Sequence, residues 1–113
     1  MFKELGQIAG LMRQLPKIKE EAERFHAKLG EIQTDGSAGG DMVVVRVNGR
    51  MEVLKVTLTE AAYALQDREM LEDLVSAAAN QALAKVRELV NAEAQNMASN
   101  LGLPPGMNLP GLT

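Results

Sequence analysis

The side chains that could do chemistry in this 113-residue sequence are mainly its charged residues, which include 15 aspartates and glutamates. There are 12 lysines and arginines, a single histidine, His26, and no cysteine. Without a cysteine or a second histidine, His26 forms neither a transition-metal site nor a catalytic pair, and a partly exposed helix residue is the simpler interpretation. We therefore expect no enzyme, no metal, no other cofactor and no small-molecule substrate. The chemistry that remains is the attraction of cationic side chains to phosphate.

The basic residues concentrate near the N-terminus, although the whole chain has a net charge of −3. The first 30 residues hold six basic and four acidic side chains, whereas the rest of the chain is net acidic. Four of the six, spaced 4, 7 and 4 apart from Arg13 to Lys28, could fall along one side of a helix and meet phosphates there. Two more arginines flank an Asn-Gly pair. The candidate DNA-binding residues are Lys3, Arg13, Lys17, Lys19, Arg24, Lys28, Arg46 and Arg50.

Sequence-specific recognition of bases is not indicated. Only Phe2, Phe25 and Tyr63 are aromatic, so there is little to stack on bases, and any contact would be to the backbone and shape of DNA. A structural or adaptor dimer, whose charges merely solvate its helices, explains the same residues. Both hypotheses stay open on the residues alone. No apolar run approaches the roughly 20 residues that a membrane helix needs, so we expect no membrane partner.

Helical periodicity dominates the N-terminal third. Apolar residues from Leu15 to Ile32 recur at steps of 3 and 4, which is a heptad pattern, and a similar period precedes them. Pro16 interrupts the pattern and predicts a kink or break near Leu15. Alternatively, the main helix begins there with Pro16 at its first position. In either case the helix should end near Gly30.

A short β-rich segment follows a glycine-rich run. The run TDGSAGG (residues 34–40) lacks the Gly-Lys-Ser/Thr of a P-loop and predicts a turn or loop. Residues 41–58, DMVVVRVNGRMEVLKVTL, alternate as a strand does, and Asn48-Gly49 predicts a tight hairpin. The apolar set changes parity between Val53 and Leu54, which indicates a bulge or a bend, or a return strand covered on both faces. With residues 31–35 as a possible first strand, the sheet has about three antiparallel strands.

The C-terminal half predicts a second long helix. Thr59 can cap a short turn over residues 60–65, and Asp67 can cap a helix that runs to about Asn100. The prolines and glycines of the last residues predict no regular structure. We therefore expect one domain at residues 1–100 and a Pro/Gly-rich tail at residues 101–113.

The lengths of these elements predict a homodimer. A helix of about 30 residues is about 45 Å long, which exceeds what a sheet of three short strands can cover. Such a sheet would also have open edges. A symmetric partner solves both problems and is the commonest arrangement.

Three runs carry a resemblance to a known family. They are residues 36–58 (GSAGGDMVVVRVNGRMEVLKVTL), residues 67–86 (DREMLEDLVSAAANQALAKV) and residues 102–111 (GLPPGMNLPG). The glycine-rich loop, the alternating strand, Asn-Gly, Glu-x-Leu-Glu-Asp-Leu and Ala-x-Asn-x-Ala together resemble the YbaB/EbfC family of nucleoid-associated proteins. The resemblance is good over residues 36–90 and looser at both ends.

The resemblance implies an α+β fold of the order α-β-β-β-α. It also implies a tweezers-like homodimer, in which long helices project from a small antiparallel sheet. The implied function is to bind double-stranded DNA with little sequence specificity, alter its conformation and contribute to nucleoid organisation and gene regulation. The implied location is cytoplasmic, at the nucleoid. The sequence departs from the family pattern at residues 59–61, where an Asp-Pro pair is common, and at Pro16.

Overall fold

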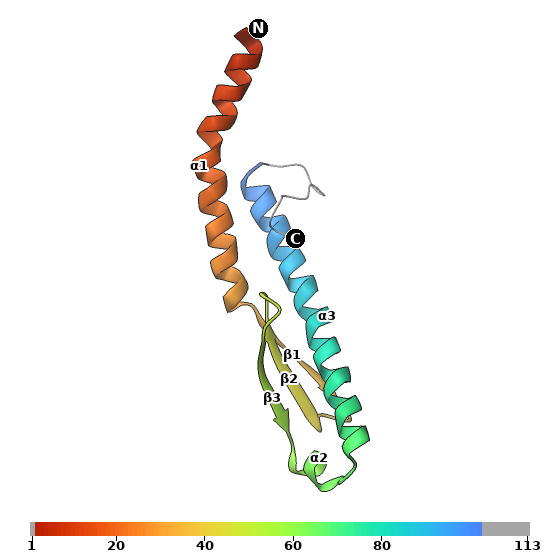
Figure 1. Cartoon of the computed structure of the whole chain (residues 1–113). Coiled ribbons are helices and arrows are strands. Elements are labelled where there is room, and N and C mark those ends of the chain that lie inside the picture. Colours follow the sequence, from red (N-terminus) through yellow and green to blue (C-terminus); the bar gives the residue numbers. More distant parts are fainter. Residues whose placement is uncertain (1, 103–113) are drawn as a thin grey trace. The chain divides into compact units, whose positions relative to one another are not determined.

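The chain folds in the order helix, three strands, helix that the sequence predicts, with one short helix added (Figure 1). The computed structural model describes residues 2–102, so the predicted tail lies outside it beyond Gly102. The described residues form two compact units: residues 2–27 with 93–102, the helical unit, and residues 28–92, the sheet unit. The elements are α1 (Phe2–Glu31), β1 (Gln33–Ala38), β2 (Val43–Asn48), β3 (Val53–Leu58), α2 (Glu60–Ala64) and α3 (Arg68–Asn100).

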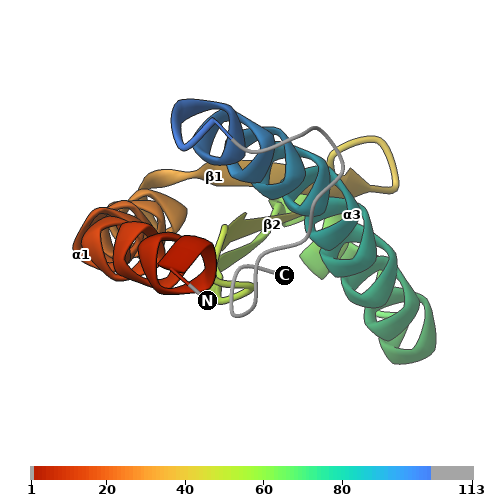
Figure 2. The same cartoon turned by 90° about the horizontal axis from the view of Figure 1, so that it is seen from above.

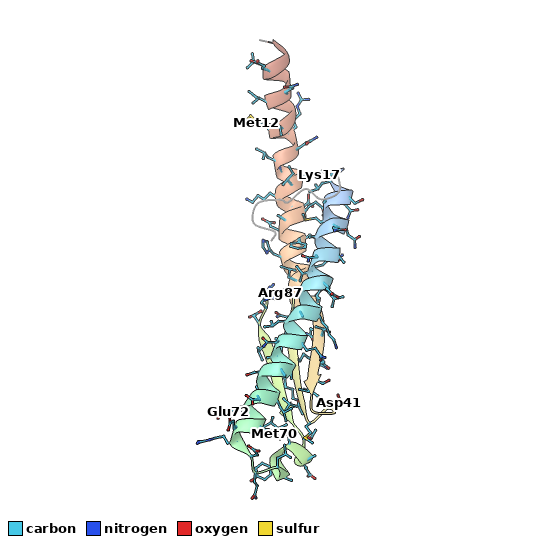
Figure 3. All side chains as sticks on the ribbon, turned by 90° about the vertical axis from the view of Figure 1, so that its right-hand side faces the viewer. Met12, Lys17, Asp41, Met70, Glu72 and Arg87 are labelled. Atoms are coloured by element: carbon cyan, nitrogen blue, oxygen red, sulfur yellow. The ribbon has the colours of Figure 1, made fainter. Side chains whose placement is uncertain are left out.

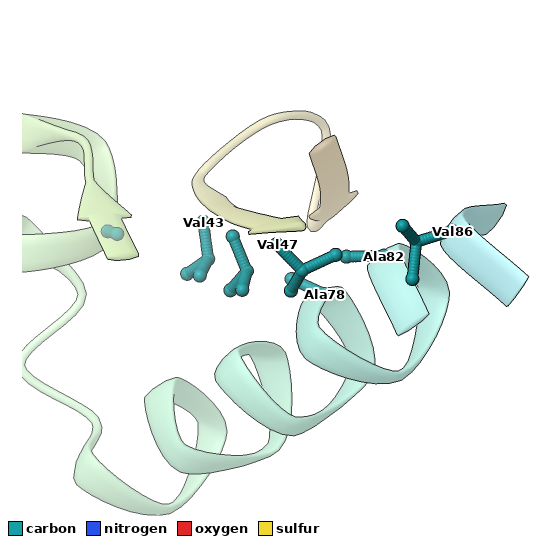
Figure 4. Packing of buried hydrophobic residues seen from close by; sticks show 7 residues of the cluster. Val43, Val47, Ala78, Ala82 and Val86 are labelled. Atoms are coloured by element: carbon teal, nitrogen blue, oxygen red, sulfur yellow. The ribbon is translucent and has the colours of Figure 1, made fainter. Parts of the chain in front are cut away.

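The core of the sheet unit lies between β2 and α3. The strands are antiparallel in the order β1-β2-β3, which confirms the predicted three-stranded sheet. Val43, Val45 and Val47 alternate along β2 and are fully buried. They cluster with small residues of α3 (Figure 4). Because these side chains are short, the helix can lie close to the strands. The α3 members of the cluster are Ala78, Ala82 and Val86.

The glycine-rich run is mostly strand, so its prediction as a loop was wrong. β1 spans Gln33–Ala38, later than the predicted residues 31–35. Gly36 explains why a strand with this composition forms: a side chain there would collide with the backbone of Ala78 and Ala82. The Ser37 N–H also donates to Gln81 Oε1 at 2.7 Å. The helix α3 therefore runs directly along β1 and β2 within this unit (Figures 1 and 2).

The turn from β1 to β2 begins only after Ala38. Gly39, Gly40 and Asp41 have φ angles of 67°, 64° and 68°. This left-handed conformation suits glycine, and aspartate tolerates it better than most side chains. The tight turn is thus confined to the end of the run.

The hairpin between β2 and β3 lies where the sequence predicts it, but its turn is longer. Residues 49–52 connect the strands, and the positive φ, 63°, falls on Met51 rather than on the Asn-Gly pair. Asn48 is 5% exposed and organises the turn with its side chain. Its Oδ1 accepts from the N–H groups of Arg50 (3.0 Å) and Glu52 (3.1 Å), and its Nδ2 donates to Glu52 Oε1.

Gly49 joins this turn to the end of α1. Its N–H donates to the carbonyl oxygens of Leu29 and Ile32, both at 2.9 Å. A side chain at Gly49 would meet the backbone of Leu29. The glycine is therefore required for close approach rather than for positive φ.

The parity change on the return strand is a β-bulge, which is one of the alternatives that the sequence leaves open. Arg46 pairs with Lys55, but the next residue, Val47, pairs with Val53. Leu54 is thus the extra residue, and the bulge puts Val53 and Lys55 on opposite faces of the sheet although they are two residues apart.

Both long helices are continuous. α1 contains Pro16 and begins at Phe2, so the predicted break and the alternative start near Leu15 were wrong. Proline lacks an N–H, so the Met12 carbonyl is deprived of its usual partner. At the start of the other long helix, Asp67 Oδ1 accepts from the Met70 N–H at 3.1 Å, and α3 runs to Asn100 as expected.

The predicted short turn after β3 is the helix α2. The Thr59 hydroxyl accepts from the Ala62 N–H at 3.3 Å, which confirms Thr59 as its cap.

Gly36→Ala should destabilise the sheet unit by about 2 kcal/mol, because the added methyl group forces α3 away from β1. Urea denaturation of the full chain measures the change. Gly6→Ala is the matched control, since nothing lies within 4 Å of its new methyl group. That control should be neutral or stabilising in a helix. Equal stability of the two variants would contradict the close approach of α3.

Candidate nucleic-acid interface

Most of the basic residues of α1 fall on one side of the helix. At about 100° per residue, Arg13, Lys17, Arg24 and Lys28 lie within an arc of about 60°. We call these four residues the basic side. Lys3 belongs to the same side by its position in the helix, although its side chain lies outside the described residues. Lys19 lies on the opposite side, so the structure separates it from the other candidates.

Arg13 and Lys17 stand one helical turn apart and are exposed. Neither forms an ion pair with the residues that the structure describes. Figure 3 shows Lys17 and the apolar Met12 on different sides of α1. These two cations are therefore available to an external anion.

Arg24 is already engaged with carboxylates of its own helix. Its guanidinium bonds Glu21 Oε1 at 2.7 Å and Glu20 Oε1 at 3.1 Å. Exposed pairs of this kind contribute little stability, but they reduce the positive potential of Arg24. A phosphate that binds Arg24 must compete with both acids.

The candidates near the hairpin are engaged in the sheet unit. Arg46 lies opposite Asp35 in the β1–β2 register and bonds its two carboxylate oxygens at 2.9 and 3.3 Å. The guanidinium of Arg50 lies against Gly30, where a Cβ atom would be 3.1 Å from Cζ. Sequence reasoning missed both interactions, because they depend on strand register and turn geometry.

The ion pair between Asp35 and Arg46 shifts the pKa values of both side chains. The hydrogen bond from Arg46 lowers the pKa of Asp35 below its ordinary value of 3.8. Desolvation opposes this shift in pKa, and the positive charges of Arg46 and Lys85 add to it. The same pairing raises the pKa of Arg46. Lys85 also donates from Nζ to the Asp35 carbonyl oxygen at 3.1 Å.

Positive charge is thus left mainly at the N-terminal part of α1. Residues 2–19 contain four basic side chains and one acidic side chain. The sheet unit, residues 28–92, contains seven basic and ten acidic side chains. The distribution favours α1 over the sheet as the surface for a polyanion.

Other chemistry finds little support in the described part of the chain. His26 is exposed and packs edge-on against the Phe25 ring, with centroids 6.1 Å apart. Within residues 2–102, no group of three or more His, Asp or Glu side chains is placed to hold a metal ion. The described helices also include none that is long and apolar enough to span a bilayer.

An open groove of about 390 Å³ lies between β3 and the beginning of α3. Its lining is largely apolar and continues the exposed side chains of β3. The lining residues are Leu58, Arg68, Leu71, Glu72, Val75 and Ser76.

Comparison with family models identifies the group to which this architecture belongs. Residues 4–101 match the YbaB/EbfC DNA-binding family. The chain belongs to the YbaB/EbfC family. The match covers both long helices and the sheet, and it confirms the family recognised from the sequence.

Curated relatives and a solved structure agree with this membership. The Nucleoid-associated protein BAV0915 of Bordetella avium is 39% identical over 105 residues, 93% of this chain and 96% of the relative. A Nucleoid-associated protein of Hahella chejuensis is 34% identical over the same length and coverage. The uncharacterized protein HP0035 of Helicobacter pylori has a similar crystal structure, with a TM-score of 0.66 and 27% identity over 81% of this chain and 94% of that one.

Membership of the YbaB/EbfC family also decides between the two hypotheses that the residues left open. The family is a DNA-binding one, which confirms the predicted class of function. None of these YbaB/EbfC comparisons supports the alternative, an adaptor without DNA contact.

Arg46→Gln should raise the pKa of Asp35 towards 3.8, because the carboxylate is deprived of its main hydrogen-bond donor. An NMR pH titration of the Asp35 carboxyl carbon measures the shift. In the wild type the lowered pKa means that the pair stabilises the fold above pH 3.8, and that this contribution disappears as the pH falls through the folded-state pKa.

Lys85→Gln is the control for this titration and should raise the pKa of Asp35 less, since Lys85 acts only through its charge and as the smallest contribution. An Asp35 pKa that does not respond to Arg46→Gln would contradict the assigned cause.

Proposed function

We propose that this YbaB/EbfC protein binds double-stranded DNA through the basic side of α1, as a homodimer. The observation that carries the proposal is the pair Arg13 and Lys17, two exposed cations without an ion-pair partner among residues 4–102, on a chain whose other surfaces are net acidic. Two-fold symmetry doubles each contact.

Recognition proceeds mainly through phosphates. The basic side offers charges one turn apart, about 6 Å along the helix axis, and no aromatic side chains that would stack on bases. Phosphate contacts fix the position of a protein on DNA but carry little sequence information. We therefore assign the protein low sequence specificity. In the homodimer, two copies of α1 that bind one duplex would also favour a DNA shape that fits both helices. Binding would therefore alter the conformation of the DNA.

The proposed location is the nucleoid within the cytoplasm, with a role in nucleoid organisation and gene regulation. The relatives from Bordetella avium and Hahella chejuensis are both named nucleoid-associated proteins, which supports this assignment.

We place the homodimer interface on β3. Every residue of this edge strand is exposed, including Val53, Leu54, Val56 and Leu58 at 45–54%. Val56 and Leu58 pair with the buried Val45 and Val43, so they point to the sheet face that α3 covers only over β1 and β2. An uncovered apolar edge strand is a liability for a free monomer.

The groove beside Leu58 extends this apolar surface onto α3 through Leu71 and Val75. A second copy that covers β3 would fill it. The interface is isologous, because each subunit presents the same strand and groove.

Arg13→Glu and Lys17→Glu should each weaken binding to a short random duplex by roughly tenfold, since each turns an attraction into a repulsion. They should also reduce the slope of log affinity against log salt by roughly one for each phosphate that the protein no longer neutralises. Fluorescence anisotropy at two salt concentrations measures both quantities.

Lys19→Glu is the matched control, with the same change of net charge on the opposite side of α1. It should have a much smaller effect on a duplex that accommodates one dimer. Equal weakening in all three variants would point to net charge alone, and no wild-type binding even at low salt would refute the DNA-binding proposal.

Val56→Asp should convert the dimer to monomers at low micromolar concentration, because it places a charge in the centre of the proposed interface. Thr57→Asp is the control, since Thr57 is exposed on the other face of the same strand. Sedimentation velocity measures the assembly state. A Val56→Asp variant that remains dimeric would move the interface away from β3.

A further inference from the structure

The N-terminal half of α1 exposes an apolar stripe that neither the fold nor the proposed DNA contacts use. The side chains are exposed by 54–64%, an unusual amount for leucine, isoleucine and methionine on a structured helix. The stripe consists of Leu5, Ile8, Leu11, Met12 and Leu15.

The stripe continues a row of buried or half-buried apolar residues on the same helix. Ile18 and Ala22 are half-buried and Phe25 is 2% exposed, and all three extend the same heptad pattern. In the helical unit, the residues of this heptad pattern are therefore buried or half-buried only from Ile18 towards the C-terminal end of α1, and are exposed before it. A helix that packs on nothing is marginal in water, so the N-terminal half of α1 requires a cover.

The stripe and the basic side lie on different sides of the helix. By the 100° rule, the stripe is centred about 180° away from the basic side. An element that covers the stripe therefore leaves Arg13 and Lys17 exposed. Two other residues fall within the arc of the stripe and bound it at either end: Glu4 and Lys19.

A second copy of α1 fits the stripe when it runs antiparallel. With residue i opposite residue 23 − i, Leu5 meets Ile18, Ile8 meets Leu15, and Leu11 meets Met12. The same register places Glu4 opposite Lys19, and two-fold symmetry repeats every pair.

The charges also disfavour the parallel arrangement in register. A parallel pair in register would place Glu4 against Glu4 and Lys19 against Lys19, and like charges that face each other are unfavourable. The antiparallel register replaces both repulsions with attractions. Neither residue forms an ion pair with the described part of its own chain, so both are available for this contact.

We propose that the apolar stripe of α1 is a self-association surface, on which α1 of a second copy docks antiparallel in this register. The paired segment extends over about 16 residues, or about 24 Å, and is smaller than a standard interface. Pairing through an interface of this size is weak and increases with local concentration. If the proposed DNA contacts are correct, each pair carries basic sides facing outwards in two directions, so it can bridge two duplexes.

Single cysteines test the register directly, because the natural chain has none. In the full-length protein, an equimolar mixture of Ile8→Cys and Leu15→Cys should form disulfide-linked pairs under mild oxidation. Each variant alone should not, since identical residues are then seven positions, about 10 Å, apart along the axis. Peptide mapping identifies the linked residues. Self-linking of Ile8→Cys would indicate a parallel pair and overturn the proposal.

A charge exchange tests the ends of the stripe. Glu4→Lys and Lys19→Glu should each weaken association beyond the β3 dimer by roughly threefold or more, as measured by sedimentation equilibrium. The double variant Glu4→Lys/Lys19→Glu should restore it, because the pairs re-form with opposite sign. No recovery in the double variant would refute the contact.

Two further variants distinguish pairing through the stripe from pairing through β3 and from docking of the C-terminal residues. Val56→Asp, which disrupts the β3 dimer, should leave the Ile8–Leu15 cross-link intact, so failure of one interface does not imply failure of the other. Cross-linking seen only in a chain truncated after Gly102 would assign the stripe to residues 103–113 of the same chain and overturn the proposal.

Discussion

The backbone of α3 lies so close to Gly36 that no side chain fits between helix and strand. This approach places Ala78 and Ala82 over the sheet and lets them bury the three alternating valines of β2. With only small residues and valines, the core gains stability from close packing rather than from large side chains. Because α3 lies over β1 and β2, the apolar face of β3 is left uncovered. The contact that completes one part of the core thus also leaves exposed the strand that carries the proposed homodimer interface.

A glycine also permits a close backbone contact at the C-terminal end of α1. The backbone N–H of Gly49 donates to two carbonyls at the C-terminal end of the helix, and Asn48 holds the turn that presents it. Helix ends leave carbonyl groups without intrahelical donors, so this contact satisfies groups that would otherwise depend on water. The hairpin therefore works as a C-terminal cap for α1 as well as a connection between strands.

Sequence patterns predicted the elements that depend on local periodicity. The alternation of Val43, Val45 and Val47 indicated β2, and the parity change indicated the bulge at Leu54. β1 was predicted too early and too short, because glycine is unfavourable in strands and the reason for Gly36 lies 42 residues away in α3. The engagement of Arg46 with Asp35 required the strand register. Pro16 within α1 showed that an exposed helix tolerates one missing hydrogen bond.

Arg24 and its two glutamates have a consequence for kinetics. The proposed phosphate contact at Arg24 must displace carboxylates that lie at 2.7 and 3.1 Å on the same helix and compete at a constant effective concentration. Internal competitors of this kind shorten the residence time of an anion without lowering the rate of encounter that the neighbouring cations provide. Substitution of either glutamate should therefore lengthen the residence time of an anion on Arg24.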